Sequence, residues 1–535
     1  MRVVVTLLTL SSLWVTLPTA AVAAVLVYLL IPDERQRAIR HLPAPASTLP
    51  VLGNTLDLMS LKLPRLHDWI TEQCKIFGGR TWRLKMLGAP PLVVVSSIEC
   101  FEDILQTQFK VFDKGERMNS IFRDLVGNGI GAVDGAQWMF QRKLLSRLFT
   151  MRAFRGNITE CVHDYTLELG RNLHEMAQTG TPIDFSDVMR HFAFDVFADV
   201  SFGLHAKSRE GKKHTQLMKA VYDMIHNIEM RFHSPDWLWK LKRALKIGSE
   251  KELAEDVATF EKTVFKIINK NMKRKLNLNT ASDKSSPRRL RTTKDVVSLF
   301  LDAQDVLNGA DDVEINAKVL RDIAVVVLLA GVDTTAWSLS WLIVMLNRNP
   351  QVEINLRLEL REKLPQLFSD PTYVPTMDDV DGLVYLEAVL RENLRLNPVV
   401  PLNAKEANRD TTLVDGTFLK KGTRVYIPSY TLGRMKSVWG HDASKFKPER
   451  WLMQDPWTGE RVIRPVSAFQ FVSFHAGPRT CLGMRFAMLE MKTVTAYMMS
   501  KYHFTTKENP KSYTYNVASI LQIKGPLIVK IQHAG

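Results

Sequence analysis

A lone cysteine in a glycine- and proline-rich loop is the residue of this chain best suited to metal chemistry. The loop runs from Phe474 to Gly483, and Cys481 stands between Gly477 and Gly483. An apolar segment from Met484 to about Tyr502 follows and is predicted to be helical. Unpaired N–H groups at a helix N-terminus stabilise a thiolate, and glycines let the backbone approach a large flat ligand closely. Cys481 is therefore a candidate axial ligand of a haem iron, with a buried inert thiol as the alternative.

An acid–alcohol pair lies in the middle of the very apolar stretch Ile323–Leu346, where Asp333 and Thr334 follow Gly331. A charge at the centre of a membrane span costs roughly 2.5–3.5 kcal/mol, so this stretch is predicted to be a core helix rather than a second span. Thr334 can bond back to a helix carbonyl, and Gly331 leaves room beside the helix while weakening it by about 1 kcal/mol relative to alanine. A helix N-cap does not explain the pair, because apolar helical sequence continues on both sides.

Two further groups of residues combine a cation with a partner at helical spacing. Trp138 and Arg142 are separated by four positions, so they face the same way, either as binding residues or as a surface stack. Glu392 and Arg395 are separated by three positions and can pair, and Arg450 lies in a later segment. Neither pattern is specific by itself.

The loop around Cys481 resembles the haem-binding signature of the cytochrome P-450 family, because Phe474, Gly477, Arg479, Cys481 and Gly483 all stand at family spacing. The resemblance extends from the proline-rich segment near the N-terminus to the last strands. It implies a mainly α fold with small β-sheets and a haem b whose iron takes the Cys481 thiolate. A thiolate ligand favours O–O cleavage, and Arg479 is expected to meet a haem propionate.

The same resemblance assigns roles to residues outside the loop. Thr334 is expected to hydrogen-bond the bound dioxygen and Asp333 to relay protons from solvent, because O–O cleavage needs two protons. Trp138 and Arg142 are expected to be propionate partners, with a charge-assisted hydrogen bond from the cation. The expected structural network consists of Glu392, Arg395 and Arg450. The expected substrate pocket includes Leu125, Ala330, Val400 and Leu521.

The implied reaction is reductive activation of dioxygen and insertion of one oxygen atom into a C–H bond of a lipophilic small molecule. Electrons are expected from NADPH–cytochrome P-450 reductase, since no Gly-x-Gly-x-x-Gly fingerprint follows a strand in this chain. The net charge is 71 − 56 = +15, which suits an acidic reductase, an anionic membrane or nucleic acid. The basic segment 277–294 has no interleaved aromatic residues, so we predict a surface loop and no nucleic-acid partner.

The substrate class rests on resemblance alone. Ala476 and the segments Gly433–Gly440 and Phe486–Lys492 are similar to the fatty-acid ω-hydroxylase branch of plants, fungi and related eukaryotes. This similarity predicts ω-hydroxylation of long-chain fatty acids. Oxidation of sterols or xenobiotics is one alternative. A hydroperoxide isomerase or a non-catalytic haem protein is another, although both would be expected to lack the acid–alcohol pair.

The N-terminal segment Val3–Ile31 is almost free of charge and long enough, as a helix, to cross a hydrocarbon core of about 30 Å. A cleaved signal peptide ending near Ala21-Val22-Ala23 is the alternative. Lys and Arg residues follow the segment, which predicts a cytosolic body on a single-pass anchor, in the endoplasmic reticulum membrane by the family resemblance. We therefore expect an anchor at 1–31, a charged and proline-rich hinge at 32–63 and a catalytic domain at 64–535.

Composition narrows the class of protein. Apolar residues make up 46% and charged residues 24%, which excludes a disordered, collagen-like or polytopic membrane protein. Four isolated cysteines exclude a disulfide scaffold and make a structural zinc site improbable, and Cys74, Cys100 and Cys161 are predicted to be inert. Short β-like runs are expected at 81–84, 91–95, 423–427 and 528–531.

Overall fold

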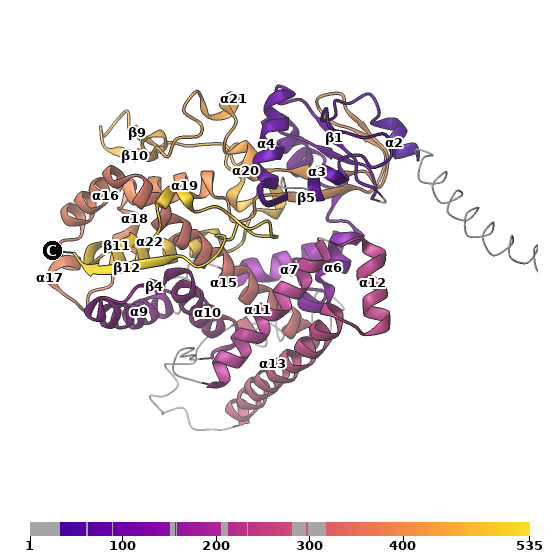
Figure 1. Cartoon of the computed structure of the whole chain (residues 1–535). Coiled ribbons are helices and arrows are strands. Elements are labelled where there is room, and N and C mark those ends of the chain that lie inside the picture. Colours follow the sequence, from indigo (N-terminus) through magenta and orange to yellow (C-terminus); the bar gives the residue numbers. More distant parts are fainter. Residues whose placement is uncertain are drawn as a thin grey trace, which may run out of the picture. The chain divides into compact units, whose positions relative to one another are not determined.

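The computed structural model describes residues 33–59, 63–87, 89–149, 156, 158–204, 212–232, 234–280, 296–297 and 317–534. The expected membrane anchor at 1–31 lies outside these residues. The chain divides into two compact units, one of residues 1–113 with 404–428 and the other of residues 114–403 with 429–535. As predicted, the fold is mainly helical with small sheets (Figure 1).

The first unit is a small mixed sheet with short helices. Its helices are α2 (Glu34–Ala38), α3 (Thr55–Met59), η1 (Leu63–Arg65), α4 (Leu66–Ile76), α5 (Ile98–Glu102) and the π-helical turn η2 (Asp103–Thr107). Its strands are β1 (Trp82–Leu84), β2 (Leu92–Val94), β3 (Phe112–Asp113), β5 (Asn403–Ala407), β6 (Thr411–Thr412), β7 (Phe418–Leu419) and β8 (Arg424–Ile427). The main sheet has the order β1-β2-β8-β5-β3, with β1 antiparallel and β8 parallel to β2. Three of the predicted β runs are thereby confirmed.

Part of the expected hinge at 32–63 is packed rather than extended. Gly53 forms isolated bridges to Leu49 and Met86 at a φ of +59°, and a Cβ there would lie 2.4 Å from the Lys85 carbonyl oxygen. Buried Asn54 donates to the hydroxyl of Thr48 at 2.9 Å. Only glycine fits this close approach, so the turn at Gly53 is what joins this segment to the sheet.

The second unit is a large helical body. Its longer helices are α6 (Glu116–Val126), α7 (Gly135–Leu148), α9 (Thr159–Thr179), α10 (Phe185–Phe202), α11 (Lys212–Phe232), α12 (Asp236–Leu245), α13 (Ser249–Thr280), α15 (Ala317–Arg348), α16 (Pro350–Lys363), α19 (Val384–Leu396) and α22 (Met484–Lys501). Its short helices are α17 (Gln366–Ser369), α18 (Met377–Asp381), α20 (Ser429–Leu432), α21 (Lys436–Trp439), η5 (Pro448–Trp451), η6 (Val472–Phe474), η7 (Gly477–Arg479) and η8 (Pro510–Ser512). Its strands are β4 (Ile183–Asp184), β9 (Leu452–Gln454), β10 (Arg461–Ile463), β11 (Tyr502–Thr506) and β12 (Ile528–His533).

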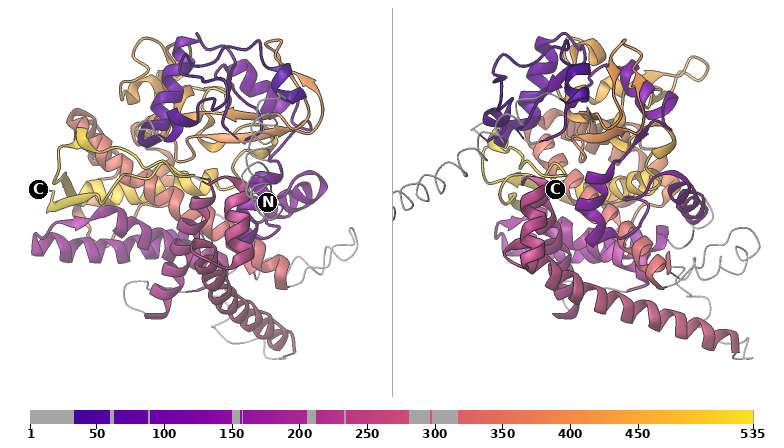
Figure 2. Two further views of the ribbon diagram at one scale, coloured as in Figure 1. Left: turned by 45° about the vertical axis from the view of Figure 1, so that its right-hand side comes forward. Right: turned by 90° about the vertical axis from the view of Figure 1, so that its right-hand side faces the viewer.

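Two of these elements bear on the predicted segments. The strand β12 covers the fourth predicted β run and pairs with β11 and β4. The long helix α13 lies beside α11 (Figure 2) and continues to Thr280. The first four residues of the predicted loop at 277–294 are therefore helical, and the rest lie outside the described residues.

The helix α15 forms the axis of the second unit. It contains the apolar stretch Ile323–Leu346, and almost every side chain in that stretch is buried. Among the described residues it is the one helix long and apolar enough to cross a membrane, yet it lies inside the core as predicted. Gly331 lets α10 approach closely, because a Cβ there would lie 2.0 Å from the ring of Phe197.

Local sequence signals explain where several helices begin and end. Asp184 accepts hydrogen bonds from the N–H groups of Ser186 and Asp187 at the start of α10, and Gly203 ends that helix in the left-handed region at φ +63°. Thr376 and Asp379 form a reciprocal capping box at α18. Such caps satisfy backbone groups that a helix end leaves unpaired, and they position the core helices firmly.

Candidate active site

The cysteine loop is held by its own backbone. The Cys481 N–H donates to the carbonyl of Phe474 at 2.8 Å, and the Thr480 N–H donates to that of Gly477 at 3.0 Å. Gly477 has a φ of +66°, which an L side chain rarely adopts. A Cβ on Gly483 would lie 3.9 Å from the Cys481 Sγ, so the backbone passes close to the sulfur. The glycines therefore present the thiol on a fixed turn directly before α22.

The surroundings of the Cys481 thiol affect its ionisation. The side chain has accessible surface, yet burial among protein atoms raises the pKa of the thiol above its ordinary value. The N–H of Gly483 and the guanidinium of Arg142 oppose that rise. The Cys481 sulfur is therefore accessible to a ligand, while the protein atoms around it disfavour the thiolate.

One face of α15 also has accessible surface. Apart from Leu329, which is half-buried, the central side chains of this helix are buried except at three positions: Ala330 is exposed, and Val326 and Thr334 are half-buried. These three residues are four positions apart, so they share one helix face. The Thr334 hydroxyl donates to the carbonyl of Ala330 at 2.6 Å, which is the back-bond expected from the sequence.

A group of cations gathers near the loop. The guanidinium of Arg479 lies 4.6 Å from the ring centroid of Trp138 and donates to Asp134 Oδ1 at 2.5 Å. Arg142 donates to the carbonyl of Thr480, next to the cysteine, at 2.5 Å. The structure thus brings three expected propionate partners, Trp138, Arg142 and Arg479, into contact with one loop or with one another.

Lys114 belongs to this group and was not predicted from the sequence. Its backbone N–H donates to both carboxylate oxygens of Asp134 at 3.2 Å. Burial and repulsion from Arg479 lower the pKa of Lys114 to about 8, and attraction to Asp134 opposes this fall. Two cations share one carboxylate here, so the local positive charge is in excess and suits the propionates of a haem. A single lysine after a strand carries no sequence pattern that would have identified it.

Asp333 lies on α15 among polar side chains of α10 and α11. Burial raises the pKa of its carboxyl to about 6, although Arg190 and Tyr222 oppose the rise. Its Oδ1 has no hydrogen-bond partner among the described residues. Arg190 lies 5.0 Å from the ring centroid of Tyr222 and pairs at 3.1 Å with Asp187, whose side chain is partly exposed. Arg190 and Tyr222 are therefore polar neighbours of Asp333, and Arg190 also pairs with a partly exposed carboxylate.

The expected structural network is present. The carboxylate of Glu392, which is 0% exposed, accepts from Arg395 Nε at 2.7 Å and Nη2 at 2.8 Å. It also accepts from Arg450 Nε at 2.9 Å, from the Lys447 N–H at 2.7 Å and from Trp451 Nε1 at 3.0 Å. This carboxylate therefore ties α19 to η5, on the chain segment that leads to the cysteine loop.

Comparison with known proteins decides the family. The family model described as "Cytochrome P450" matches residues 43–531. The chain belongs to the cytochrome P-450 family. It is 32% identical over 456 residues to "Cytochrome P450 94A1" of Vicia sativa, covering 85% of this chain and 83% of the relative. It is 32% identical to "Cytochrome P450 94B1" of Arabidopsis thaliana, covering 88% of each, and 31% identical to "Cytochrome P450 86B1" of the same plant, covering 90% of this chain and 83% of the relative.

Membership of the family has direct consequences for the chemistry. This cytochrome P-450 is a monooxygenase, an oxidoreductase that binds haem with a cysteine thiolate as axial ligand. It takes electrons from a redox partner and acts on a lipophilic substrate. The accessible Cys481 thiol and the partly buried cations Lys114, Arg142 and Arg479 fit that cofactor.

The residues predicted for the substrate pocket of this cytochrome P-450 fall into two classes. Ala330 and Val400 have accessible surface. Leu125 and Leu521 are buried in the apolar core, and the Leu521 carbonyl accepts from Trp341 Nε1 at 2.7 Å. Ala330 and Val400 are therefore the stronger candidates for contact with a substrate.

Proposed function

We propose that this cytochrome P-450 hydroxylates the ω-carbon of long-chain fatty acids, using NADPH electrons supplied by a separate NADPH–cytochrome P-450 reductase. The observation that carries the monooxygenase chemistry is the accessible thiol of Cys481 on its glycine-bounded turn. The fatty-acid class is supported by the similarity of segments 433–440 and 486–492 to the ω-hydroxylase branch. The apolar surroundings of Ala330 suit a hydrocarbon chain.

The proposed cofactor site consists of residues that the fold brings together. Cys481 would ligate the iron, and Arg142, Arg479, Trp138 and Lys114 would hold the propionates. Phe474, Gly477 and Gly483 would shape the turn. When bound, haem b supplies the reductive activation of dioxygen that transfers one oxygen atom into a C–H bond.

We propose that Asp333 and Thr334 supply the protons. With its pKa raised to about 6, the Asp333 carboxyl can take up and release a proton near neutral pH. Partly exposed Asp187 and the Arg190–Tyr222 stack place polar groups between that carboxyl and solvent. The Thr334 hydroxyl, oriented by its bond to the Ala330 carbonyl, would hold the proton at Oγ1 on the accessible face of α15.

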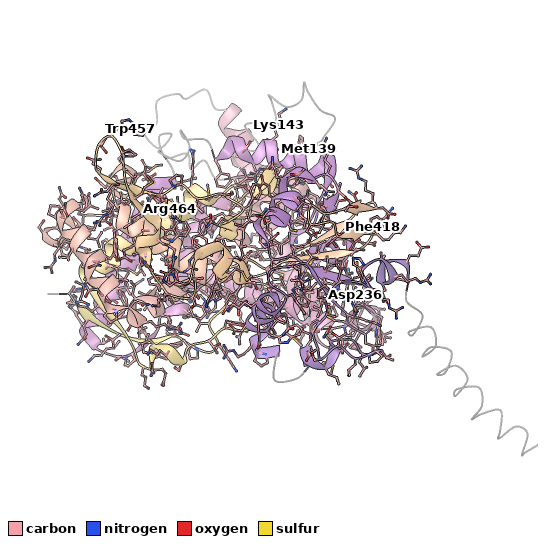
Figure 3. The ribbon with its side chains drawn as sticks, turned by 90° about the horizontal axis from the view of Figure 1, so that it is seen from above. Met139, Lys143, Asp236, Phe418, Trp457 and Arg464 are labelled. Atoms are coloured by element: carbon pink, nitrogen blue, oxygen red, sulfur yellow. The ribbon has the colours of Figure 1, made fainter. Side chains whose placement is uncertain are left out.

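An exposed face of α7 is the proposed docking site for the reductase. Met139 and Lys143 are four positions apart, are both exposed and project from the same helix (Figure 3). Arg142, on the same helix, reaches the loop carbonyl beside Cys481. The net charge of +15 favours a partner with an acidic surface, and such steering weakens as ionic strength rises.

Association with the endoplasmic reticulum membrane is supported by α12. Its residues Trp237, Leu241 and Leu245 are four positions apart, and their exposed fractions are 66%, 47% and 59%. Lys240 and Lys246 are exposed nearby. Exposed apolar side chains flanked by cations are typical of a helix that lies in a lipid interface. We propose that this face binds lipid alongside a single-pass anchor at 1–31.

The experiment begins with the ferrous carbon-monoxide difference spectrum. We expect a band near 450 nm for the parent enzyme and for the control Cys100→Ala, and its loss in Cys481→Ala. A 450 nm band that survives in Cys481→Ala would refute the ligand assignment. Fatty acids of increasing chain length are then supplied with reductase and NADPH. Turnover of sterols or xenobiotics alone would reject the fatty-acid proposal. Activity on hydroperoxides combined with no activity in the presence of reductase and NADPH would reject monooxygenation.

A further inference from the structure

A buried carboxyl group joins the two helices that carry the proposed active-site residues. Glu490 on α22 is 0% exposed, and Thr335 on α15 is also buried. The Thr335 hydroxyl donates to Glu490 Oε2 at 3.1 Å. Among the described residues, it is the one side-chain hydrogen bond between α15 and α22.

The surroundings of this bond are apolar and tightly packed. Gly331, one turn before Thr335, lies against the ring of Phe197, and that ring packs on Phe486 of α22 with centroids 4.9 Å apart. Val332, Ala336 and Leu489 are buried in the same core. A polar group costs free energy in such a place unless it is hydrogen-bonded, so its retention needs a reason.

Glu490 faces no cation among the described residues that influences it. Burial raises the pKa of its carboxyl to about 8, and the Thr335 hydroxyl is the one group that opposes this. The thiol of Cys161 on α9 also faces Glu490, and Asp199 on α10 lies 3.9 Å from the Cys161 sulfur. With only neutral or acidic neighbours, the carboxyl group carries its proton at neutral pH. Its Oε1 has no partner among the described residues.

The position of the bond in the chain gives it a role. Thr335 directly follows Asp333 and Thr334, and Glu490 lies on the helix that begins just after Cys481. A hydrogen bond here fixes the register of one helix against the other. Small misplacements of reacting groups lower rates strongly, so such a link affects chemistry at a distance.

We propose that Glu490 is a positioning residue, which through Thr335 holds Asp333 and Thr334 in place relative to Cys481 and so sets the share of NADPH that yields hydroxylated product. This inference rests on the proposed function. In productive turnover NADPH, H⁺, O₂ and the substrate give NADP⁺, water and the alcohol. In uncoupled turnover NADPH, H⁺ and O₂ give NADP⁺ and hydrogen peroxide.

The test uses the full-length haem-loaded enzyme with reductase, NADPH and hexadecanoic acid, and measures product and peroxide per NADPH. Thr335→Val and Glu490→Leu remove the hydrogen bond, and each should lower product per NADPH by roughly three- to fivefold while peroxide rises. Glu490→Gln keeps an acceptor for the Thr335 hydroxyl and should restore coupling. The matched control is Thr495→Val, since Thr495 is a buried threonine on α22 whose hydroxyl has no partner among the described residues. The amount of product per NADPH in Thr495→Val should equal that of the parent.

Three results would overturn the proposal: coupling in Thr335→Val equal to the parent, uncoupling in Glu490→Gln as severe as in Glu490→Leu, or equal uncoupling in Thr495→Val. Where Glu490→Leu does not fold, Thr335→Val carries the test. If Thr334→Ala leaves coupling unchanged, the proposed proton delivery fails. If Thr334→Ala uncouples but Thr335→Val does not, only the present inference fails.

A second measurement needs no substrate. The conversion of the 450 nm carbon-monoxide complex to a 420 nm form reports how firmly the thiolate side is held. We expect it to be at least about threefold faster in Thr335→Val than in Thr495→Val. Equal rates would count against the link even where hexadecanoic acid is not oxidised.

Discussion

The Glu392 network allows a quantitative prediction. In Glu392→Gln the side chain keeps its shape but loses its charge, so the buried Arg395 guanidinium loses its counter-ion and Arg450 keeps only its 3.2 Å pair with Asp442. Arg395 also donates to the carbonyls of Ala443 at 2.6 Å and Lys445 at 3.0 Å, which hold it in place. Removing one partner of a buried ion pair typically costs about 3–5 kcal/mol.

This cost converts to a shift in melting temperature. The second unit contains about 400 residues. At about 2.1 cal/mol/K per residue, its unfolding entropy is roughly 0.8 kcal/mol/K, so the expected fall in Tm is about 4–6 °C. Differential scanning calorimetry of the haem-loaded protein measures it. The control is Glu255→Gln on α13. Among the described residues Glu255 forms an ion pair only with exposed Lys251, at 3.9 Å, so its loss should shift Tm by less than about 1 °C. A Glu392→Gln protein that melts within about 1 °C of the parent would refute the reasoning.

Three other changes test separate features of the fold. Gly331→Ala places a methyl group 2.0 Å from a phenylalanine ring of α10 and should lower the free energy of unfolding, measured by urea denaturation, by about 1–3 kcal/mol. Gly382→Ala is the control and should be neutral, because the nearest atom to its added methyl group lies at 3.6 Å. Equal stabilities of the two variants would contradict the packing argument. Burial raises the pKa of Glu490 to about 8, so the contribution of this carboxyl to stability is full below about pH 4.5 and is lost as pH rises through about 8. The Tm of the parent should therefore fall relative to that of Glu490→Gln over this pH range. A Tm difference that stays constant with pH would speak against a protonated carboxyl. Arg231→Met leaves the buried carboxylate of Glu250, which lies 2.7 Å from the arginine, without this counter-ion and should lower the free energy of unfolding by about 3–5 kcal/mol in the same urea assay. Arg243→Met, at a largely exposed arginine, should cost under about 1 kcal/mol. Similar losses in both variants would argue against the burial effect.

The helices and the cysteine loop were predictable because their signals lie within single segments. The apolar stretch around Asp333 predicts α15, and its central polar residues correctly exclude a second membrane span. The loop around Cys481 carries its own glycines and is followed by α22 at the expected residue. The four β runs form strands because β-branched residues and their flanking turns are local features.

Contacts between distant segments were not predictable in the same way. Nothing near Lys114 in the sequence points to Arg479, and the link between Thr335 and Glu490 joins two helices that are far apart in the chain. The neighbours of Asp333, Arg190 and Tyr222, come from other helices as well. Such pairs depend on how helices pack, which no local pattern records.

The amino-acid sequence alone was enough to establish a mainly helical cytochrome P-450 with Cys481 as the candidate ligand, because residue spacing along one segment encodes both helix faces and turn chemistry. Tertiary structure alone decided which buried charges share a partner, which face of α15 stays accessible and which carboxyl group links α15 to α22. The physical reason is that desolvation and hydrogen bonding act between whichever groups packing brings together, regardless of their distance along the chain.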